Sequence, residues 1–416
     1  MRTAFVIPIV LALAACGPTL PKLPDLDFSP FPPAVRQAIE QAQSEAEFTP
    51  GDNIRVMTLA KVLHAHGLLD AATVYYRYAR KLSPDDATCL HLLGMALSER
   101  GNYPDALEAL NAALARRPDH KATKFALAAA LLASGGTVEA SALYRALGDH
   151  PVAHFGLGQT LRGAAQIEEF RKALALEPRY GASWKAIAEA LRVKGENEKA
   201  DEASRGYDRY HDFTPSTGDA ELAAVGELDQ RPAGLRQRAQ RAESESRLLD
   251  AAKLYEQAVN HDPNDDAVIA KWIATLVRLK DQDAATKAYQ AGILRKPESP
   301  SLAAVYGLLL NATHRRAEAG LYFEKAVAAD PRQAEAWFEL GLNAAAEGAD
   351  QRALDCFGKA LLADPAHRQA RYQAALVLTK NRKGDLAREQ LELAAQGPDD
   401  EWTGKARLAL AGLPKR

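Results

Sequence analysis

The stretch that decides the fold is Ala334–Pro365, AEAWFELGLNAAAEGADQRALDCFGKALLADP. It contains two runs in which apolar or small residues recur at the spacing of a helix face, one before and one after Gly348. These positions are Trp337, Leu340, Gly341 and Ala344, then Ala353, Phe357 and Ala360. Pro365 ends the second run, because proline lacks a backbone donor and clashes with the preceding turn. The stretch therefore predicts two consecutive helices.

The same unit recurs along the chain. Pro263, Pro297, Pro331 and Pro365 are spaced by 34 residues, and Pro84 and Pro118 keep that spacing. Equivalent positions are occupied by Ala60, Gly67, Ala72, Tyr76 and Ala79, by Leu90, Leu93, Gly94, Gly101, Ala106 and Ala113, and by Tyr306, Gly307, Ala319, Phe323 and Ala326. We count nine or ten units.

This pattern resembles the tetratricopeptide repeat, in which each unit is a pair of antiparallel helices. The resemblance covers nearly all of residues 52 to 412. It implies an all-α fold, a right-handed superhelical α-solenoid of about nine or ten repeats. Within a unit, we expect Gly341 and Ala353 to lie where the two helices cross most closely, because larger side chains would push the helices apart.

Interruptions of the pattern divide the chain into two blocks. Around residues 150 to 178 the phase slips by about four residues, so one unit or its junction is short. Residues 213–231, which begin Phe213-Thr-Pro-Ser-Thr-Gly-Asp, are weakly patterned. We interpret them as a boundary or linker between an N-terminal block (34–212) and a C-terminal block (232–416). Residues 34–50 are predicted as a leading helix and 401–413 as a capping helix.

The N-terminus predicts the compartment. Residues 1–15 combine Arg2 with an apolar run, as a secretory signal peptide does, and the run is too short to span a bilayer. The run ends in Leu13-Ala14-Ala15-Cys16, which resembles a bacterial lipobox and implies acylation of Cys16. An ordinary cleaved signal is the alternative. Gly17 in place of Asp favours the outer membrane. Residues 16–33 are expected to form a lipidated, proline-rich tether, in which residues 18–33 reach on the order of 50 Å.

Composition argues against several kinds of function. The 416 residues carry a net charge of −2 without a long basic run, so no nucleic acid partner is expected. Cys89 and Cys356 are expected to be packed apolar residues rather than reactive thiols. His64 and His66 point to different helix faces and do not suggest a metal pair. Motifs for metal, haem, nucleotide or serine catalysis are missing, so the sequence predicts no cofactor and no enzymatic activity.

The resemblance also implies where partners bind. In this family the inner surface is lined by the second, fifth, ninth and twelfth residues of the first helix of each unit. One early unit places Thr88, His91, Met95 and Ser98 there. The C-terminal block is more apolar, and its predicted partner-binding groove consists of Leu308, Asn311, Phe338, Leu342, Tyr372 and Leu376. In the alternative interpretation, the terminal helix or the superhelical turn covers these side chains.

Together these patterns predict a membrane-anchored periplasmic scaffold or adaptor lipoprotein. It would face the periplasm from the outer membrane, be held there by acyl chains on Cys16, and bind other envelope proteins. The alternatives are a non-catalytic accessory subunit of an envelope enzyme, secretion or electron-transfer complex, and a glycan-binding envelope protein.

Overall fold

The computed structural model describes residues 19–211, 213–396 and 401–413. These residues form 23 α-helices and no strand, which confirms the predicted all-α fold. The chain divides into two compact units, Met1–Gln230 (unit 1) and Arg231–Arg416 (unit 2). None of the described helices is long and apolar enough to cross a membrane.

Unit 1 contains α1 (Pro33–Phe48), α2 (Asn53–Ala65), α3 (Leu69–Leu82), α4 (Ala87–Glu99), α5 (Tyr103–Arg116), α6 (Lys121–Ala133), α7 (Thr137–Ala146), α8 (Pro151–Thr160), α9 (Gly163–Leu176), α10 (Gly181–Val193), α11 (Asn197–Tyr210) and α12 (Ala220–Gly226). Unit 2 contains α13 (Pro232–Ser244), α14 (Leu248–His261), α15 (Asp266–Arg278), α16 (Gln282–Arg295), α17 (Pro300–Ala312), α18 (Arg316–Ala329), α19 (Ala334–Ala346), α20 (Asp350–Ala363), α21 (Arg368–Lys380), α22 (Gly384–Ala394) and α23 (Glu401–Gly412).

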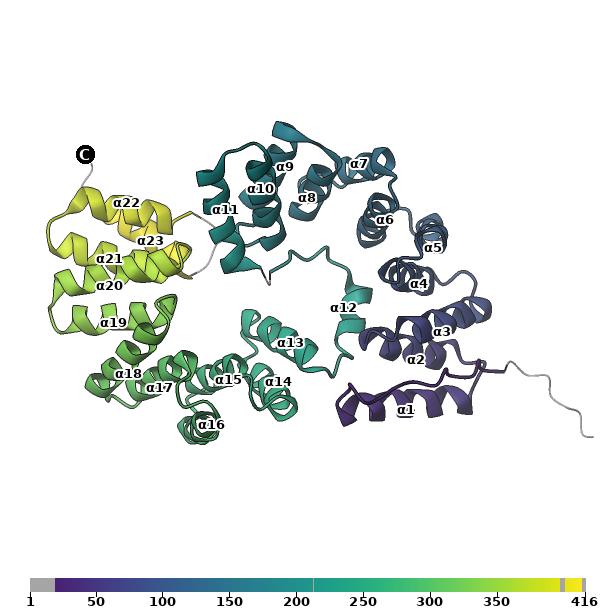
Figure 1. Ribbon diagram of the computed structural model, residues 1–416, viewed down its shortest axis with the longest axis horizontal. Coiled ribbons are helices and arrows are strands. Elements are labelled where there is room, and N and C mark those ends of the chain that lie inside the picture. Colours follow the sequence, from purple (N-terminus) through teal and green to yellow (C-terminus); the bar gives the residue numbers. More distant parts are fainter. Residues whose placement is uncertain (1–18, 212, 397–400, 414–416) are drawn as a thin grey trace, which may run out of the picture. The chain divides into compact units, whose positions relative to one another are not determined.

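Consecutive helices pack as pairs in both units (Figure 1). The described part of the chain holds five pairs in unit 1, from α2/α3 to α10/α11, and five in unit 2, from α13/α14 to α21/α22. The leading helix α1 packs on α2, and the last helix α23 packs on α21 and α22. Within each unit, each pair stacks on the next, so each unit is built from local contacts between neighbouring pairs.

Glycines let the two helices of a pair approach each other. A Cβ atom placed on Gly341 would lie 2.5 Å from Cε1 of Phe357, and one on Gly307 would lie equally close to Phe323. The predicted close crossing at Gly341 is therefore present, and the ring of Phe357 is the side chain nearest to it. Both Phe357 and Ala353 are fully buried.

In most pairs, a residue with a left-handed backbone conformation lies in the turn between the two helices. At this position Gly67, Gly101, Gly135, Gly195 and Gly348 have positive φ, and so do the non-glycine residues Ser246, Lys280, His314 and Arg382. A side chain with a Cβ atom costs about 1–2 kcal/mol in the left-handed region. Four turns of unit 2 therefore carry a backbone strain that glycine would relieve.

Replacing Lys280 or His314 with glycine is expected to stabilise unit 2. Their φ values are 62° and both side chains are exposed, so the substitution removes strain without removing packing. Each variant should raise the free energy of unfolding by about 0.5–1 kcal/mol, since the flexibility of glycine in the unfolded chain offsets part of the gain. Urea titration measures this, with Gly348→Ala, which introduces the same strain, as the control expected to destabilise.

The phase slip near residue 158 corresponds to a shortened pair, as the sequence predicted. Helix α8 has 10 residues, whereas α19 has 13. A Cβ atom on Gly158 would meet the ring of Phe170 at 2.5 Å, and that ring lies 12 positions later instead of the 16 that separate Gly341 from Phe357. The missing four residues come from the end of the first helix and its turn, so the crossing itself is preserved.

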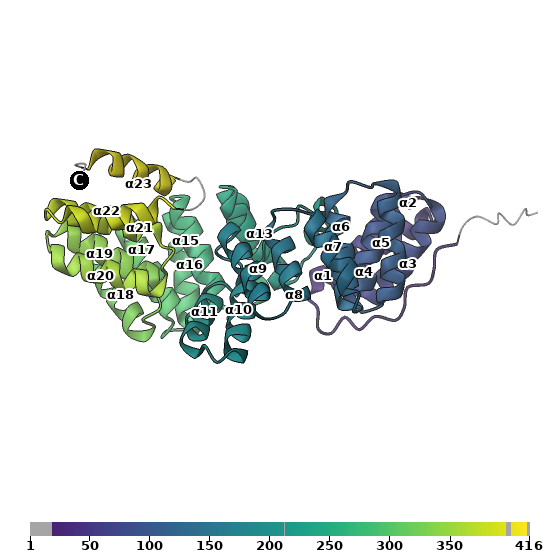
Figure 2. The ribbon, with the colours of Figure 1, turned by 90° about the horizontal axis from the view of Figure 1, so that it is seen from above.

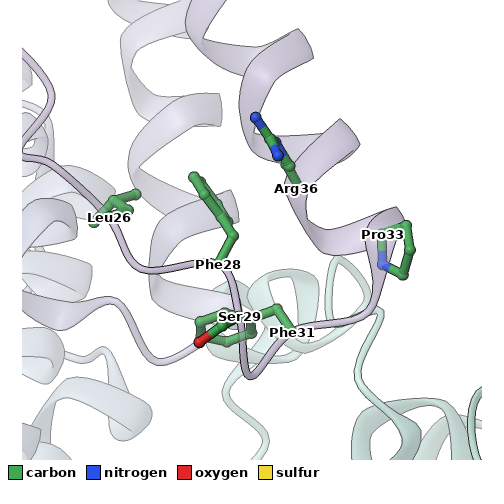
Figure 3. Close-up of a pocket in the computed structure, with 6 residues that line it drawn as sticks. All are labelled: Leu26, Phe28, Ser29, Phe31, Pro33 and Arg36. Atoms are coloured by element: carbon green, nitrogen blue, oxygen red, sulfur yellow. The ribbon is translucent and has the colours of Figure 1, made fainter.

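Residues 19–32, here called the strap, contain no helix or strand, turn at residues 28–31 and lie against the first helices of unit 1. Its partly buried apolar side chains pack on the core of the first repeats; they are Leu20, Leu23, Leu26, Phe28 and Phe31. The Tyr75 hydroxyl donates to the Pro21 carbonyl at 2.9 Å. Figure 3 shows Phe28 beside Arg36, whose guanidinium carbon lies 5.6 Å from the ring centroid. Together with Phe31 and Pro33 they line a hollow of about 530 Å³.

The expectation of a freely extended tether over residues 16–33 is therefore wrong for the strap. Burial of its apolar side chains, at roughly 25 cal/mol per Å², holds it on the repeats. The predicted signal peptide (1–15) and the predicted lipidation site, Cys16, lie outside the described residues.

Candidate binding surfaces

The inner helices of unit 1 hold a segment from outside the repeats. Residues 213–230, here called the α12 segment, include α12, which packs on α2 and α4 (Figure 1). Val225 is 3% exposed and belongs to the core of the first repeats, and Leu222 and Leu228 pack against that core. The stretch that the sequence predicts only as a boundary thus carries a short amphipathic helix seated on the repeats.

Asp219 fastens the start of this helix. Its Oδ1 accepts from the Leu222 amide at 2.8 Å and caps the helix, while its Oδ2 contacts Nε2 of the fully buried His91 at 2.9 Å. Burial alone would raise the pKa of Asp219. The hydrogen bonds from His91 and the Leu222 amide, with the charges of His91 and His120, outweigh burial and hold this pKa below its usual value. Asp219 is therefore an ionised acceptor at neutral pH.

Glu221 makes a second charged contact. Arg117 Nη1 donates to Oε1 at 2.7 Å, and His120 Nε2 lies 3.4 Å from Oε2. Burial again works to raise the pKa of this carboxyl, but the hydrogen bond from Arg117 and the nearby cations bring it below its usual value. Thr123 joins the two histidines, with its Oγ1 3.0 Å from His91 Nδ1 and 2.7 Å from His120 Nδ1.

The ionised carboxylate of Asp219 can only accept, so Nε2 of His91 carries the proton of the hydrogen bond that joins them. The guanidinium of Arg117 donates to Glu221 in the same way. The repeats thus present donors to both carboxylates of the α12 segment.

The end of the segment is held by a third histidine. His66 is 1% exposed, lies 2.7 Å from the Val62 carbonyl through Nδ1, and accepts from the Gln230 amide at 3.2 Å through Nε2. His64 instead contacts the Tyr76 hydroxyl and Glu99, both at 3.3 Å. The two histidines point to different neighbours, as predicted.

Residues 63–122 and 97–162, which include this surface, match the family model described as tetratricopeptide repeat. These residues are therefore similar in sequence to tetratricopeptide repeats. A curated relative, Tetratricopeptide repeat protein 7B from human and from mouse, is 34% identical over 85 residues. That match covers 20% of this chain and 10% of the length of each relative.

Solved structures are similar to parts of this chain at low sequence identity. Yeast Tom70 is 14% identical, with 86% of this chain and 95% of that chain covered and a TM-score of 0.40. PilF of Pseudomonas aeruginosa is 18% identical, with 44% and 88% covered and a TM-score of 0.36. PilW, described as a type IV pilus biogenesis factor, is 21% identical, with 43% and 87% covered and a TM-score of 0.35.

In the helix pairs of unit 2, three of the predicted groove residues form a repeated series. Leu308 on α17, Leu342 on α19 and Leu376 on α21 occupy equivalent places, 34 residues apart. The first two are half-buried and Leu376 is 42% exposed. We call these three residues the leucine stripe. Its role in binding stays a prediction.

Two other predicted groove residues are largely covered. Phe338 is 6% exposed and packs between Phe357 and His367, with ring centroids at 6.0 and 4.8 Å, so its assignment to an open groove is wrong. Tyr372 is half-buried beside Trp402 of α23, at a centroid distance of 5.8 Å. Figure 2 shows α23 at the end of the C-terminal pairs. For Tyr372 the alternative interpretation, cover by the terminal helix, applies.

The last predicted groove residue, Asn311, contacts Glu339, which the sequence analysis did not single out. Its Nδ2 donates to Glu339 Oε2 at 2.8 Å. Burial raises the pKa of Glu339 to about 7, and the nearby Glu335 adds to this, against opposing effects of Asn311, Arg316 and His367. Glutamates on an amphipathic helix have the pattern of solvated surface charge, so no signal in the sequence marked this carboxyl as partly removed from water.

Both cysteines of the described repeats are buried and free, in agreement with the predicted packing role. Cys89 is fully buried and its Sγ donates to the Tyr76 carbonyl at 3.4 Å. Burial raises the pKa of the Cys89 thiol to about 12 and also raises the pKa of Cys356. Neither forms the thiolate that reactive cysteines require at neutral pH.

Proposed function

We propose that this protein is a membrane-anchored periplasmic scaffold lipoprotein that binds partner proteins through its tetratricopeptide surfaces. The observation that supports this most directly is the α12 segment. The repeats of unit 1 hold a helical segment through a buried valine and two ionised carboxylates. A surface that holds a helix of its own chain has the shape and chemistry to hold a helix of another protein.

Anchoring would come from the N-terminus. The sequence Leu13-Ala14-Ala15-Cys16 supports cleavage before Cys16 and acylation of that residue. Each buried methylene contributes about 0.8 kcal/mol, so two or more acyl chains give a lasting anchor. Gly17 supports a place on the outer membrane.

The strap shortens the distance between lipid and protein. Leu20 packs against the core of unit 1 and lies only four positions after Cys16. An extended chain spans at most about 3.6 Å per residue, so these positions reach roughly 15 Å. In this proposal unit 1 lies close to the headgroups, and the scaffold concentrates its partners near the membrane surface.

The anchor is tested by the Cys16→Ser variant expressed with its own signal peptide. Wild type should fractionate with membranes and incorporate labelled palmitate, whereas the variant should do neither. A chain that stays in the membrane fraction and remains labelled after this substitution would show that Cys16 is not the acylated residue.

Partner binding through unit 2 is tested by cross-linked affinity capture from native membranes. Leu376→Glu places a charge in the leucine stripe and should abolish capture of a partner that wild type recovers. Leu386→Glu, at a 50% exposed leucine on α22, is the matched control and should leave capture unchanged. Equal loss with both variants, or no loss with either, would argue against the stripe as the binding surface.

A further inference from the structure

In unit 1, the α12 segment and the repeat residues that hold it come from different parts of the chain. His91 lies on α4, Thr123 lies on α6, and Arg117 and His120 lie in the turn before α6. We call these four residues the acceptor cluster. The carboxylates that they contact, Asp219 and Glu221, follow the last repeat of the unit by sequence.

The occupant has the character of a bound peptide. Helix α12 has seven residues, which is too short for stability in isolation, so its order depends on the surface beneath it. Its carboxylates lie at the start, and its apolar residues follow at three-residue intervals, Leu222, Val225 and Leu228. Flanking residues 213–218 form no helix or strand.

The acceptor cluster has hydrogen-bonding capacity beyond what α12 uses. Arg117 contacts Glu221 through Nη1 alone, and its buried Nε and Nη2 have no hydrogen-bond partner. A guanidinium can bind a carboxylate through two parallel hydrogen bonds. A segment that places its second carboxylate slightly differently would therefore gain a contact that α12 does not make.

We propose that the acceptor cluster is a binding site for an acidic amphipathic helix of a partner protein and that the α12 segment is its resident competitor. This deepens the scaffold function and rests on it. The partner helix carries two carboxylates at its start, two positions apart, followed by apolar residues at three-residue spacing. The resident is tethered and so has a high local concentration, which lowers the apparent affinity of the site for partners.

The test uses the full chain and a fluorescent peptide of residues 213–230, FTPSTGDAELAAVGELDQ. In the chain, Asp219→Asn with Glu221→Gln weakens the resident without changing its size or touching the acceptor cluster. We expect the peptide to bind this double variant at least about tenfold more tightly than wild type, because the competing helix no longer holds the site. Fluorescence anisotropy measures both affinities.

Charge specificity is tested by changing the peptide and the site in turn. The peptide with Asp219→Asn and Glu221→Gln should bind the double variant at least about tenfold more weakly than the native peptide. Adding Arg117→Glu to the double variant should abolish binding of the native peptide, and a peptide with Glu221→Arg should recover part of it. Circular dichroism, and hydrogen exchange of α2 to α6, show that each variant keeps its repeats folded.

Equal peptide affinity for wild type and the double variant would overturn the resident role. Absence of binding to both, with folded repeats, would overturn the acceptor site itself. Neither result depends on capture of a membrane partner through the leucine stripe. The scaffold function and this inference can therefore fail separately.

Discussion

Replacing Phe357 with alanine is expected to lower the free energy of unfolding of unit 2 by about 3–5 kcal/mol, the range for a fully buried aromatic ring. The ring is fully buried, faces Gly341 across the helix pair and packs near Phe338 in the same core cluster. Its loss would leave a cavity between α19 and α20. Urea titration of the full chain, followed by tryptophan fluorescence, measures the change.

Variants of Gly341 test whether Phe357 stabilises unit 2 through its contact between α19 and α20. Gly341→Ala alone should cost about 1–3 kcal/mol, because its Cβ would lie 2.5 Å from the ring. In the Phe357→Ala background this cost should vanish. Gly358→Ala, at an exposed helical glycine with no atom within 4 Å of the added Cβ, should stabilise by about 0.5–1 kcal/mol. Additive costs at 341 and 357 would contradict the proposed contact.

The stability of unit 2 is expected to fall by about 3 kcal/mol between pH 4.5 and pH 7 through Glu339 alone. The pKa of Glu339 is about 7 in the folded protein, whereas the ordinary glutamate value of 4.5 applies to the unfolded chain. Below pH 4.5 both states bind the proton, and stability is greatest. As the pH rises, the unfolded chain releases the proton while the folded chain retains it, so stability falls until the carboxyl ionises near pH 7.

The contribution of Glu339 is isolated by comparison with a variant that cannot ionise. The difference in unfolding free energy between wild type and Glu339→Gln should change across pH 4.5–7 and remain constant above that range. Glu347→Gln, at the exposed C-cap of the same helix, is the control and should leave the wild-type profile unchanged. A Glu339→Gln difference that is independent of pH would show that this carboxyl ionises normally.

The proposed binding surfaces of the two units differ in how far they are covered and in the pKa values of their carboxyl groups. In unit 1 the α12 segment covers the acceptor cluster, and its carboxylates have lowered pKa values because the repeats supply hydrogen bonds and cations. In unit 2 the leucine stripe is half-buried to exposed, and Glu339 has a raised pKa because burial dominates. The carboxyl groups of Asp219 and Glu221 are thus shifted in the opposite direction to that of Glu339, because hydrogen bonds and cations outweigh burial in unit 1 and do not in unit 2.

Local and periodic features could be predicted from the sequence. The helix pairs, their spacing, the short pair near residue 158 and the packed cysteines depend on residues that are close in sequence, or on a repeat whose every copy carries the same signal. His91 was predicted on the inner surface from its place in the repeat. Of the candidate groove, the leucine stripe and Asn311 lie half-buried or exposed, whereas Phe338 is a core residue.

What the sequence by itself determined is the all-α repeat architecture, because apolar spacing, small residues at crossings and prolines at helix ends act within one unit. Only the tertiary structure decided the positions of the strap and the α12 segment, the contact of α23 with Tyr372 and the half-buried position of Glu339. Each depends on contacts between residues far apart in the chain or on burial by a neighbouring pair. A short irregular segment gains order only from the surface that it meets, and its own residues do not specify that surface.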